Sequence, residues 1–541
     1  MRLFLLAALA LAHPTLALAQ TAPDAALRQR VEAALASAPA GTRFGLLVVD
    51  DKGREVLAIN PDQRFIPASN TKLFTTALAF DTFAANPDAA LRGGISFVLL
   101  DHGKGAPDLL IRGEGGAVLS TAPDCTQHCL ASYIDKVAAS SGKIGDVIAD
   151  DTAFPDQRWS PGMSWNNIQT DSGTATSALL FDDAQLLITA APGKVGEAPV
   201  VTLSPYYTQR NEAVTGPEGS KTTLGFERAP NSRVVRIFGS IAAGQQPWRD
   251  LLGIDDPAHY AAWAAQQALL ARGVKVKGTV RVLHRTMPAP SAVAPALAGK
   301  ARIAWAEAPV ALADEVSVIN KRSQNLHAEV LLRRAGAALA GGGLFTADEA
   351  PVGSREAGLK ALEAMLGRIG IARTSYDFAD GSGMSSYNRV SPRAGVALLR
   401  WAARQPWAAV WRASLPIGGQ DGTLRRRFVG TPLQGKLFAK TGTLNATNAL
   451  SGYLIAASGR ELTFAWTGDR VTGITDNMTP SRSVTFSYDG NGDLVEWTDV
   501  GGASWAFTYD TNHLLLTTRD PNQASALAPA QVIEASSTYT V

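Results

Sequence analysis

The sequence predicts an α+β fold: an antiparallel sheet flanked by helices, with a large β-rich insertion and a short β-repeat segment at the C-terminal end. Two observations predict the helices, because Leu73–Phe80 is apolar at helical spacing and Val330–Leu332 opens a second helical run. A third predicts the sheet, because Leu437–Ala439 and Ala449–Leu454 are apolar runs joined by a polar turn. With 541 residues, the chain is long enough for several domains.

The first 19 residues predict a secretory signal peptide. Met1 and Arg2 form a short positive start, Leu3–Ala12 is an apolar core, and Ala17–Ala19 ends in small residues. No lipid-anchor cysteine follows, and no later stretch is long enough to cross a membrane. We therefore expect cleavage after Ala19 and a mature protein that is exported and soluble.

The chain then predicts a helix and a hairpin before it reaches Ser69. Residues 25–38 are alanine-rich with apolar residues at helical spacing, and 44–50 and 55–58 are apolar runs around a turn. Further along, 354–366 predicts another helix.

Between these parts, residues 91–284 contain short apolar runs broken by Gly, Pro and Asp, which predict strands. We assign 20–90 and 285–466 to one domain that carries the chemistry and 91–284 to inserted β-rich units. Nothing in the insertion carries obvious chemistry, so we expect a structural or substrate-positioning role for it.

The motif Ser69-x-x-Lys72 stands at the start of the first predicted helix. Residues three apart share a helix face, so the Ser69 hydroxyl and the Lys72 amine should lie side by side. A serine becomes a good nucleophile when a neighbouring neutral lysine accepts its proton. The motif alone is weak evidence, because Ser69 could be an ordinary helix cap and Ser140–Lys143 has the same spacing in Ser-Gly-rich sequence.

Two further motifs strengthen this interpretation. Ser323-Gln324-Asn325 precedes the second helical run, and Lys440-Thr441-Gly442-Thr443 lies on a predicted strand. Each has an ordinary alternative, since Ser-x-Asn recurs at Ser164 and Ser386 and Lys-Thr-Gly can simply end a strand. The ordered set of three carries the weight.

In this order the motifs resemble those of penicillin-recognising serine acyl-transferases. Ser69 and Ser323 are about 250 residues apart, far more than in small serine β-lactamases. The resemblance is completed by Asp150–Phe154, Asp380–Arg389 and Asp421–Phe428. Together these stretches are similar to the D-alanyl-D-alanine carboxypeptidase/endopeptidase family, the class C low-molecular-mass penicillin-binding proteins, over roughly residues 25–466.

The resemblance implies a transpeptidase/β-lactamase-like fold with two β-rich accessory domains in the insertion. It also implies a serine-type D-Ala-D-Ala carboxypeptidase acting on peptidoglycan stem peptides, with endopeptidase activity on cross-links left open, inhibited by β-lactams and placed in the periplasm. Ser69 would form the acyl-enzyme, Lys72 would be the general base, and Ser323 would pass a proton to the leaving amine. The substrate would be held by Asn325, Lys440, Thr441, Gly442 and Thr443.

The resemblance stops after Trp466, where the family adds a C-terminal helix on its sheet. Instead, Tyr488-Asp489 and Tyr509-Asp510 are 21 residues apart, an internal repeat similar to the Tyr-Asp repeats of Rhs-type proteins, which form β-hairpin arrays. We assign 467–521 to this segment and 522–541 to a disordered tail. The segment is either a real fusion or the product of joining two unrelated coding segments; the junction inside a fold favours the latter.

The composition limits the kinds of partner and cofactor that we expect. The net charge of +2 gives no reason to expect nucleic acid as a partner. Cys125 and Cys129 could form a local disulfide or remain free thiols, and the chain shows no complete metal-ligand spacing, so we expect neither metal nor cofactor.

Two other functions remain as alternatives. The same motifs could serve a β-lactamase or esterase, although the long insertion argues against it. The protein could also be an inactive secreted protein, because the C-terminal part of the catalytic fold is replaced.

Overall fold

The structure is a computed structural model of the 541-residue chain. It describes residues 25–39, 41–286, 299–340, 343–344, 349–445, 447–469, 473–475, 483–489, 494–498, 502–509, 515–519 and 531–532. The predicted signal peptide, residues 1–19, lies outside the described residues. Among those described, no helix is both long enough and apolar enough to span a membrane.

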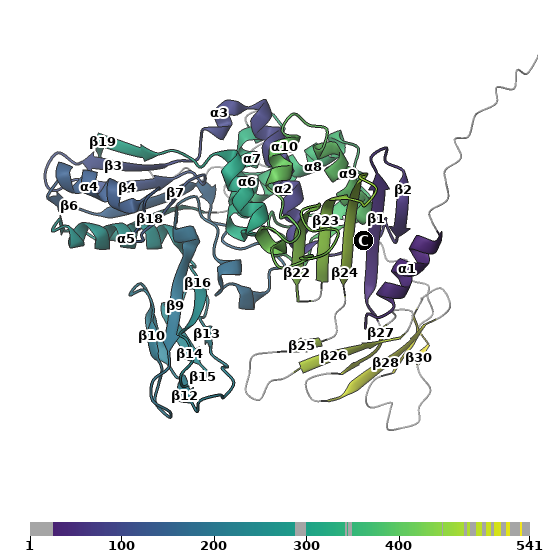
Figure 1. The fold of residues 1–541 in the computed structure, drawn as a ribbon. Coiled ribbons are helices and arrows are strands. Elements are labelled where there is room, and N and C mark those ends of the chain that lie inside the picture. The colour runs from purple at the N-terminus through teal and green to yellow at the C-terminus, as the bar shows by residue number, and fades with distance from the viewer. Residues whose placement is uncertain are drawn as a thin grey trace, which may run out of the picture.

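A five-stranded antiparallel sheet with helices against it forms the first unit (Figure 1). The strand order is β2-β1-β24-β23-β22, so the first hairpin pairs with a strand more than 400 residues later; Asp50 of β1, for example, lies opposite Leu462 of β24. The strands are β1 (Arg43–Asp50), β2 (Glu55–Ile59), β22 (Leu437–Leu444), β23 (Thr447–Ile455) and β24 (Glu461–Asp469).

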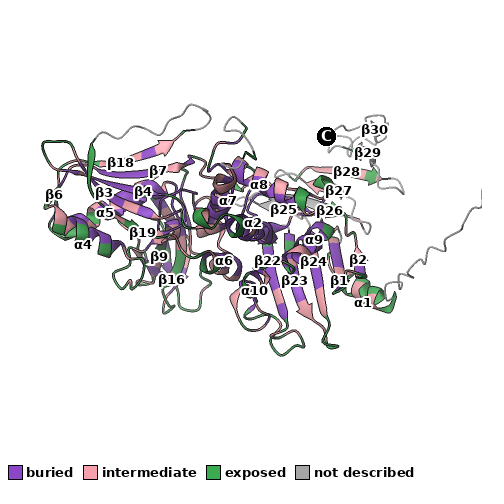
Figure 2. Cartoon of the chain, turned by 90° about the horizontal axis from the view of Figure 1, so that it is seen from above, coloured by how far each residue is buried: buried purple, intermediate pink, exposed green. Residues whose placement is uncertain are grey.

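Most helices of this unit bury their apolar faces together, as the purple ribbons near α2 and α7 in Figure 2 show, whereas α1 contributes no buried residue. Apolar residues four positions apart, Leu73 and Ala77 on α2 and Leu331 and Ala335 on α7, face this core, so the two helices form its centre. The helices are α1 (Ala25–Leu35), α2 (Thr71–Ala85), α3 (Pro87–Ala90), α6 (Leu312–Lys321), α7 (Asn325–Ala340), α8 (Arg355–Arg368), α9 (Pro392–Ala402) and α10 (Ala408–Ala413). Two short strands, β20 (Tyr376–Asp377) and β21 (Arg389–Val390), pair beside them.

The inserted unit contains its own five-stranded sheet, of order β18-β7-β4-β3-β19, with two helices packed against it. Unlike the first sheet, it mixes parallel and antiparallel pairs. Its elements are β3 (Ile95–Asp101), β4 (Asp108–Gly113), β7 (Val147–Pro155), β18 (Val280–Arg285), β19 (Lys300–Glu307), α4 (Leu130–Ser140) and α5 (Pro257–Ala271), with the short pairs β5 (Val118–Leu119) with β8 (Leu180–Phe181) and β6 (Lys143–Ile144) with β17 (Lys275–Val276).

A second inserted part extends away from this sheet on small sheets of two or three strands (Figure 1). Its strands are β9 (Gln185–Ala191), β10 (Val200–Thr202), β11 (Thr208–Asn211), β12 (Val214–Gly216), β13 (Gly225–Glu227), β14 (Val234–Phe238), β15 (Ser240–Ala242) and β16 (Trp248–Gly253). The two parts agree with the β-rich insertion that the sequence predicts.

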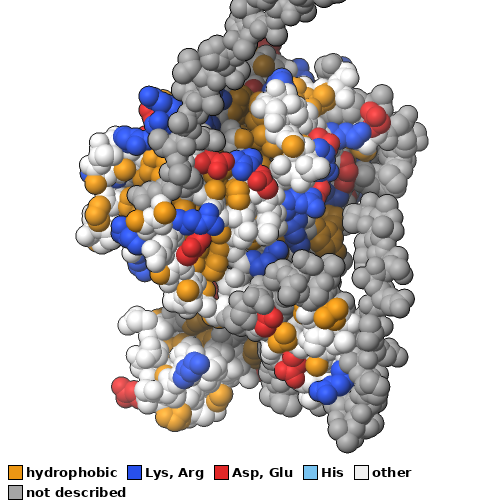
Figure 3. Space-filling model, turned by 90° about the vertical axis from the view of Figure 1, so that its right-hand side faces the viewer, with side chains coloured by type: hydrophobic (Ala, Val, Ile, Leu, Met, Phe, Trp, Pro, Cys, Tyr) orange, Lys and Arg blue, Asp and Glu red, His pale blue; other side chains and the backbone are white. Residues whose placement is uncertain are grey.

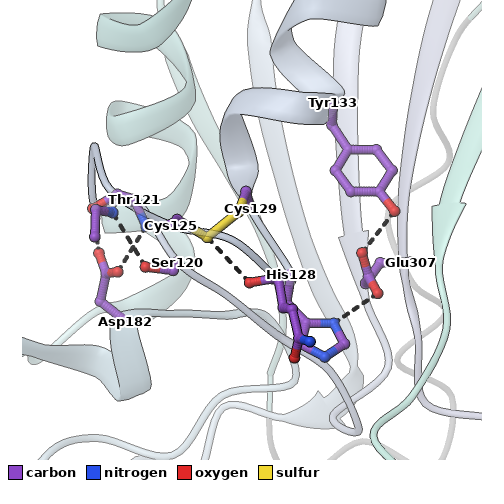
Figure 4. The surroundings of a disulfide bond; sticks show 10 residues. Ser120, Thr121, Cys125, His128, Cys129, Tyr133, Asp182 and Glu307 are labelled. Atoms are coloured by element: carbon purple, nitrogen blue, oxygen red, sulfur yellow. Dashed lines mark hydrogen bonds and ion pairs between the residues drawn. A yellow bond between two sulfur atoms is a disulfide. The ribbon is translucent and has the colours of Figure 1, made fainter.

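The boundary of the insertion predicted at residue 284 needs a correction. Strand β19 pairs with β3 from Ile95 to Asp101, so residues 300–307 lie in the inserted sheet and not in the range 285–466 assigned to the first domain. Figure 4 shows a further contact at this edge: the Glu307 carboxylate accepts a hydrogen bond from the Tyr133 hydroxyl and lies beside His128. Strand pairing between segments this far apart has no local sequence signal.

Cys125 and Cys129 form a disulfide immediately before α4 (Figure 4). This resolves the alternative between a disulfide and free thiols that the sequence left open. The bond closes a short loop that carries His128.

The C-terminal segment is a six-stranded antiparallel sheet of order β25-β26-β27-β28-β29-β30. The two Tyr-Asp units adopt the same register, because Tyr488 pairs with Leu494 and Tyr509 pairs with Leu515. Trp497 and Trp505 stack between the units with ring centroids 3.9 Å apart. The strands are β25 (Gly473–Thr475), β26 (Ser483–Tyr488), β27 (Leu494–Thr498), β28 (Ser504–Tyr509), β29 (Leu515–Arg519) and β30 (Gln531–Val532).

The prediction of a disordered tail over 522–541 is wrong for β30, which pairs with β29. The rest of that range lies outside the described residues. Of the elements described after Trp466, all are strands, so the sheet lacks a described C-terminal helix; Trp466 itself is half-buried and stacks on Phe44. On the face shown in Figure 3, acidic and basic side chains lie interspersed, in keeping with the small net charge.

Candidate active site

Ser69 lies in a tight turn at the start of the central helix. Residues Ala68–Asn70 form a 3-10 turn that leads directly into α2, and Ala68 has a left-handed φ of 45°. No side chain caps either helix start, so the Ser69 hydroxyl does not serve as a cap. It points instead to the lysine one helical turn later.

Lys72 is fully buried and its amine contacts three oxygen atoms. The Nζ atom lies 2.8 Å from Ser69 Oγ, 2.6 Å from Asn325 Oδ1 and 2.6 Å from the Ser382 carbonyl oxygen. The helical spacing predicted from Ser-x-x-Lys is therefore confirmed as a direct contact. This geometry lets the amine take the hydroxyl proton when it is neutral.

Burial lowers the pKa of Lys72 to about 7, while the charges of Asp380 and Glu329 oppose this shift. Loss of solvation is therefore the main cause of the lowered pKa of Lys72, and the charge of Lys72 adds to burial in lowering the pKa of Lys440. Near neutral pH, a substantial fraction of Lys72 can act as a base.

Ser323 and Asn325 reach the same place from the start of α7. Ser323 has a left-handed φ of 61°, and its hydroxyl accepts a hydrogen bond of 2.9 Å from Lys440 Nζ. Asn325 is held between the two units, because its Oδ1 accepts from Lys72 and its Nδ2 donates to the Ser172 carbonyl oxygen at 2.9 Å. Both residues therefore lie together with Ser69 and Lys72.

Lys440 and its neighbours come from the edge strand β22 of the first sheet. Lys440 is fully buried and also donates to the Thr441 carbonyl oxygen. Gly442 lets the strand approach the nucleophile turn, because a Cβ atom there would lie 2.6 Å from the Pro67 carbonyl oxygen and 3.1 Å from Ser69 N. A larger residue at 442 would push the strand away from Ser69.

An open cleft of about 520 Å³ lies over these residues and is lined by Ser69, Ser323, Asn325, Thr441 and Thr443. The sequence did not predict the part of its wall that comes from the insertion, namely Asp171, Ser172, Gln185 and Leu251. The wall also includes Met384, Thr423 and Arg427, which lie in the stretches Asp380–Arg389 and Asp421–Phe428 that completed the resemblance. The insertion thus contributes directly to the cleft. Arg427, one of three exposed consecutive arginines, gives the cleft a positive side chain at its rim.

A family model for the "D-Ala-D-Ala carboxypeptidase 3 (S13) family" matches residues 27–482, and a model of the RHS repeat matches residues 488–525. The first match includes all eight residues predicted for the site. It extends past residue 466, the residue after which the resemblance was expected to stop.

Two curated relatives are similar over most of the chain. A D-alanyl-D-alanine carboxypeptidase of Actinomadura sp. (strain R39) is 33% identical over 480 residues, which are 84% of this chain and 83% of the relative. The D-alanyl-D-alanine carboxypeptidase DacB of Haemophilus influenzae is 24% identical, over 79% of this chain and 85% of the relative.

A solved structure shares the fold. The crystal structure of penicillin binding protein 4 (dacB) from Haemophilus influenzae aligns with a TM-score of 0.65 and 22% identity, covering 80% of this chain and 91% of that one. The penicillin-recognising fold with its large β-rich region, expected from the motifs, is thereby confirmed.

Proposed function

This chain belongs to the D-Ala-D-Ala carboxypeptidase 3 (S13) family and is a serine-type D-Ala-D-Ala carboxypeptidase of peptidoglycan, and we propose that Ser69 is its acylated serine. The observation that carries the proposal is the 2.8 Å contact between Ser69 Oγ and the buried Nζ of Lys72. In the described part of the chain, the second Ser-x-x-Lys copy has no such contact.

In the first step, Ser69 Oγ attacks the carbonyl carbon of the penultimate D-alanine and its proton moves to Lys72 Nζ. Backbone N–H groups of Ser69 and Thr443 stabilise the oxyanion, a contribution of about 3 kcal/mol for each donor. When the C–N bond breaks, the Ser323 hydroxyl gives a proton to the leaving amine of D-alanine. The proton that Lys72 took from Ser69 then passes to Ser323, so that Ser323 is again a hydroxyl and Lys72 is again neutral. Lys440 Nζ, 2.9 Å from Ser323 Oγ, supports this transfer.

In the second step, water attacks the ester carbonyl and Lys72 accepts its proton. As the ester C–O bond breaks, Lys72 returns this proton to Ser69 Oγ, which releases the shortened peptide and regenerates the Ser69 hydroxyl. Asn325 holds the peptide backbone, while Lys440, Thr441 and Thr443 face its terminal carboxylate. Gly442 keeps the strand close to Ser69. The same cleft would accept D-Ala-diaminopimelate cross-links, and β-lactams would acylate Ser69. Residues 1–19 would direct the protein to the periplasm.

The test is release of D-alanine from a synthetic peptide ending in Lys-D-Ala-D-Ala, with and without prior incubation with benzylpenicillin. We expect release that benzylpenicillin blocks, and no release from the same peptide ending in L-Ala-L-Ala. Rapid hydrolysis of benzylpenicillin without D-alanine release would favour the β-lactamase alternative. A stable fold with neither activity would favour the inactive alternative.

A further inference from the structure

Beside Lys72 lies a turn of backbone held by two buried carboxylates. The turn is Gly381-Ser382-Gly383, and the carboxylates belong to Glu329 on α7 and to Asp380. Glu329 is 5% exposed and Asp380 is completely buried. Buried acids are rare unless they are paired, so their partners show what holds them there.

Each carboxylate binds backbone N–H groups of the turn. Glu329 Oε1 accepts from Gly381 N at 3.0 Å and from Ser382 N at 2.9 Å. The Asp380 carboxylate accepts from Gly383 N at 2.8 Å and Ser385 N at 2.6 Å. The turn is therefore fixed from both ends by charge-assisted hydrogen bonds, which are stronger than neutral ones.

The turn also packs directly against the nucleophile helix. Thr75 Oγ1, one turn after Lys72, donates to the Gly381 carbonyl oxygen at 2.7 Å. Gly383 has a φ of 88°, and a Cβ atom there would lie 1.9 Å from the Ala68 carbonyl oxygen. The position of the Ser382 carbonyl relative to Lys72 is thus set by contacts on every side.

The hydrogen-bond partners of Lys72 make that carbonyl chemically important. A neutral amine has two N–H bonds and one lone pair. Two of the three partners, the carbonyl oxygens of Asn325 and Ser382, can only accept, so they take the two N–H bonds. The lone pair is then directed at the third partner, the Ser69 hydroxyl.

We infer that Glu329 and Asp380 are positioning residues for the base: they hold the Ser382 carbonyl so that the Lys72 lone pair faces Ser69. Their negative charges also favour the protonated form of the Lys72 amine. The inference rests on the proposed function of Lys72 and extends it to two carboxylates that do not touch the substrate.

The charged groups around Lys72 come from α7, from the loop after β20 and from β22. On α7, Glu329 is paired with the buried Arg333 at 2.9 Å. The loop after β20 contributes Asp380, whose pKa burial and the Glu329 charge raise to about 6. Strand β22 contributes Lys440, whose pKa is lowered. Of these, the two acids favour the protonated form of Lys72, so removing one should lower the pKa of Lys72.

The chain offers a matched control on neighbouring helices. Glu315 on α6 is also buried and pairs with a buried arginine, Arg334 on α7, at 2.7 Å. It is not among the groups that shift the pKa of Lys72. Glu315→Gln and Glu329→Gln therefore both leave a buried arginine facing an amide, but only the second removes charge beside the base.

The experiment measures second-order acylation by a chromogenic cephalosporin from pH 5 to 9, with thermal unfolding of each variant. For Glu329→Gln and Asp380→Asn we expect the acid-side midpoint to fall by about 1 pH unit, at the lower end of the shift of about 1 to 3 units that an opposite charge nearby causes in a pKa. The plateau rate should also fall by about tenfold in Asp380→Asn. The new side-chain NH₂ group would face one of the backbone N–H groups that now donate to Asp380, so that one hydrogen bond to the turn is lost. Glu315→Gln should lose comparable thermal stability and keep the wild-type midpoint.

Unchanged midpoints in both variants, or an equal shift in Glu315→Gln, would overturn the inference. If Glu329→Gln does not fold, the acylation midpoint of Asp380→Asn alone tests the inference.

A wild type that is never acylated would count against the proposed function. The inference would then be tested by the pH dependence of the free energy of unfolding. Since the pKa of Lys72 is lower in the folded protein, Lys72 adds stability as pH rises above about 7, relative to Lys72→Met. With Asp380→Asn, that rise should begin at lower pH; an unchanged onset would contradict the inference.

Discussion

The chain contains the pattern Ser-x-x-Lys twice, at Ser69–Lys72 and at Ser140–Lys143, and the two copies differ in secondary structure, in contacts and in burial. Ser69 and Lys72 sit at the start of the buried helix α2, with Ser69 Oγ and Lys72 Nζ 2.8 Å apart. Ser140 is the last residue of α4, and Lys143 begins the strand β6, so the helix ends between them. The Ser140 hydroxyl donates to the Lys136 carbonyl oxygen instead.

The difference shows that spacing alone does not make a catalytic pair. Residues three apart meet only when one helix continues through both, and Gly142 and an extended Ser141 end the helix in the second copy. Burial is the other requirement: Lys72 is fully buried and has a lowered pKa, whereas Lys143 is exposed. The first copy alone combines contact with a base that can be neutral near pH 7.

Replacing the two serines gives the largest expected contrast. Ser69→Ala should lower acylation by benzylpenicillin by on the order of 10⁴-fold or more, because no other oxygen occupies the nucleophile position. Ser140→Ala should leave the rate unchanged. The measurement is the intact and peptide mass after incubation, where the wild type should carry one penicilloyl group on the peptide containing Ser69. An adduct that persists in Ser69→Ala would remove the basis of the comparison.

The lysines should differ by somewhat less. Lys72→Met removes the base but leaves the nucleophile and oxyanion donors, so we expect a loss of about 10²- to 10⁴-fold in the acylation rate, the usual range for general base catalysis. Lys143→Met should behave like the wild type. Stopped-flow acylation with a chromogenic cephalosporin measures both. Equal rates for the two variants would mean that Lys72 is not the base.

A third contrast concerns pH. Because the neutral amine is the active form, the acylation rate should rise with pH and reach half its plateau at about 7, the pKa of Lys72. Below that pH, the rate should fall by about tenfold for each pH unit. Ser140→Ala provides the control and should keep the same profile. A midpoint near 10, the pKa of a solvated lysine, would show that burial does not tune Lys72.

The parts of the site carried by short motifs could be predicted from the sequence. All eight predicted residues, from Ser69 to Thr443, lie around one cleft or directly beneath it. Order and spacing sufficed because each motif joins a local turn to a helix or strand. The local elements, such as β22 and β23 around a turn, were predictable for the same reason.

The parts that depend on contacts distant in sequence could not be predicted. The Ser172 carbonyl holds Asn325 across a separation of 153 residues, so the wall from the insertion had no local signal. In the sequence, Glu329 is an ordinary polar residue of a predicted helix and Asp380 is one of a predicted loop. Their role in holding the Ser382 carbonyl follows from their burial and from the conformation of Gly383. Neither property can be inferred from composition or periodicity.

The smallest expected effect lies beside the second copy itself. The Cys125–Cys129 disulfide closes the loop immediately before α4, the helix that ends at Ser140 (Figure 4). Cys125→Ser with Cys129→Ser should lower the free energy of unfolding by about 2 kcal/mol, as expected for a loop this short. Thermal unfolding with and without a reductant measures this loss.

If the second copy is only structural, this variant should keep the wild-type acylation rate while the inserted unit becomes less stable. The link to the site would be the hydrogen bond from Asn325 to the Ser172 carbonyl, the contact that joins the inserted unit to the catalytic residues. A slower acylation rate at a temperature where the variant is fully folded would therefore mean that strain around α4 reaches Asn325. The two copies would then be coupled through the insertion. Ser69 and Lys72 would still act directly in the reaction, but the region around Ser140 and Lys143 would affect it indirectly and could not be called silent.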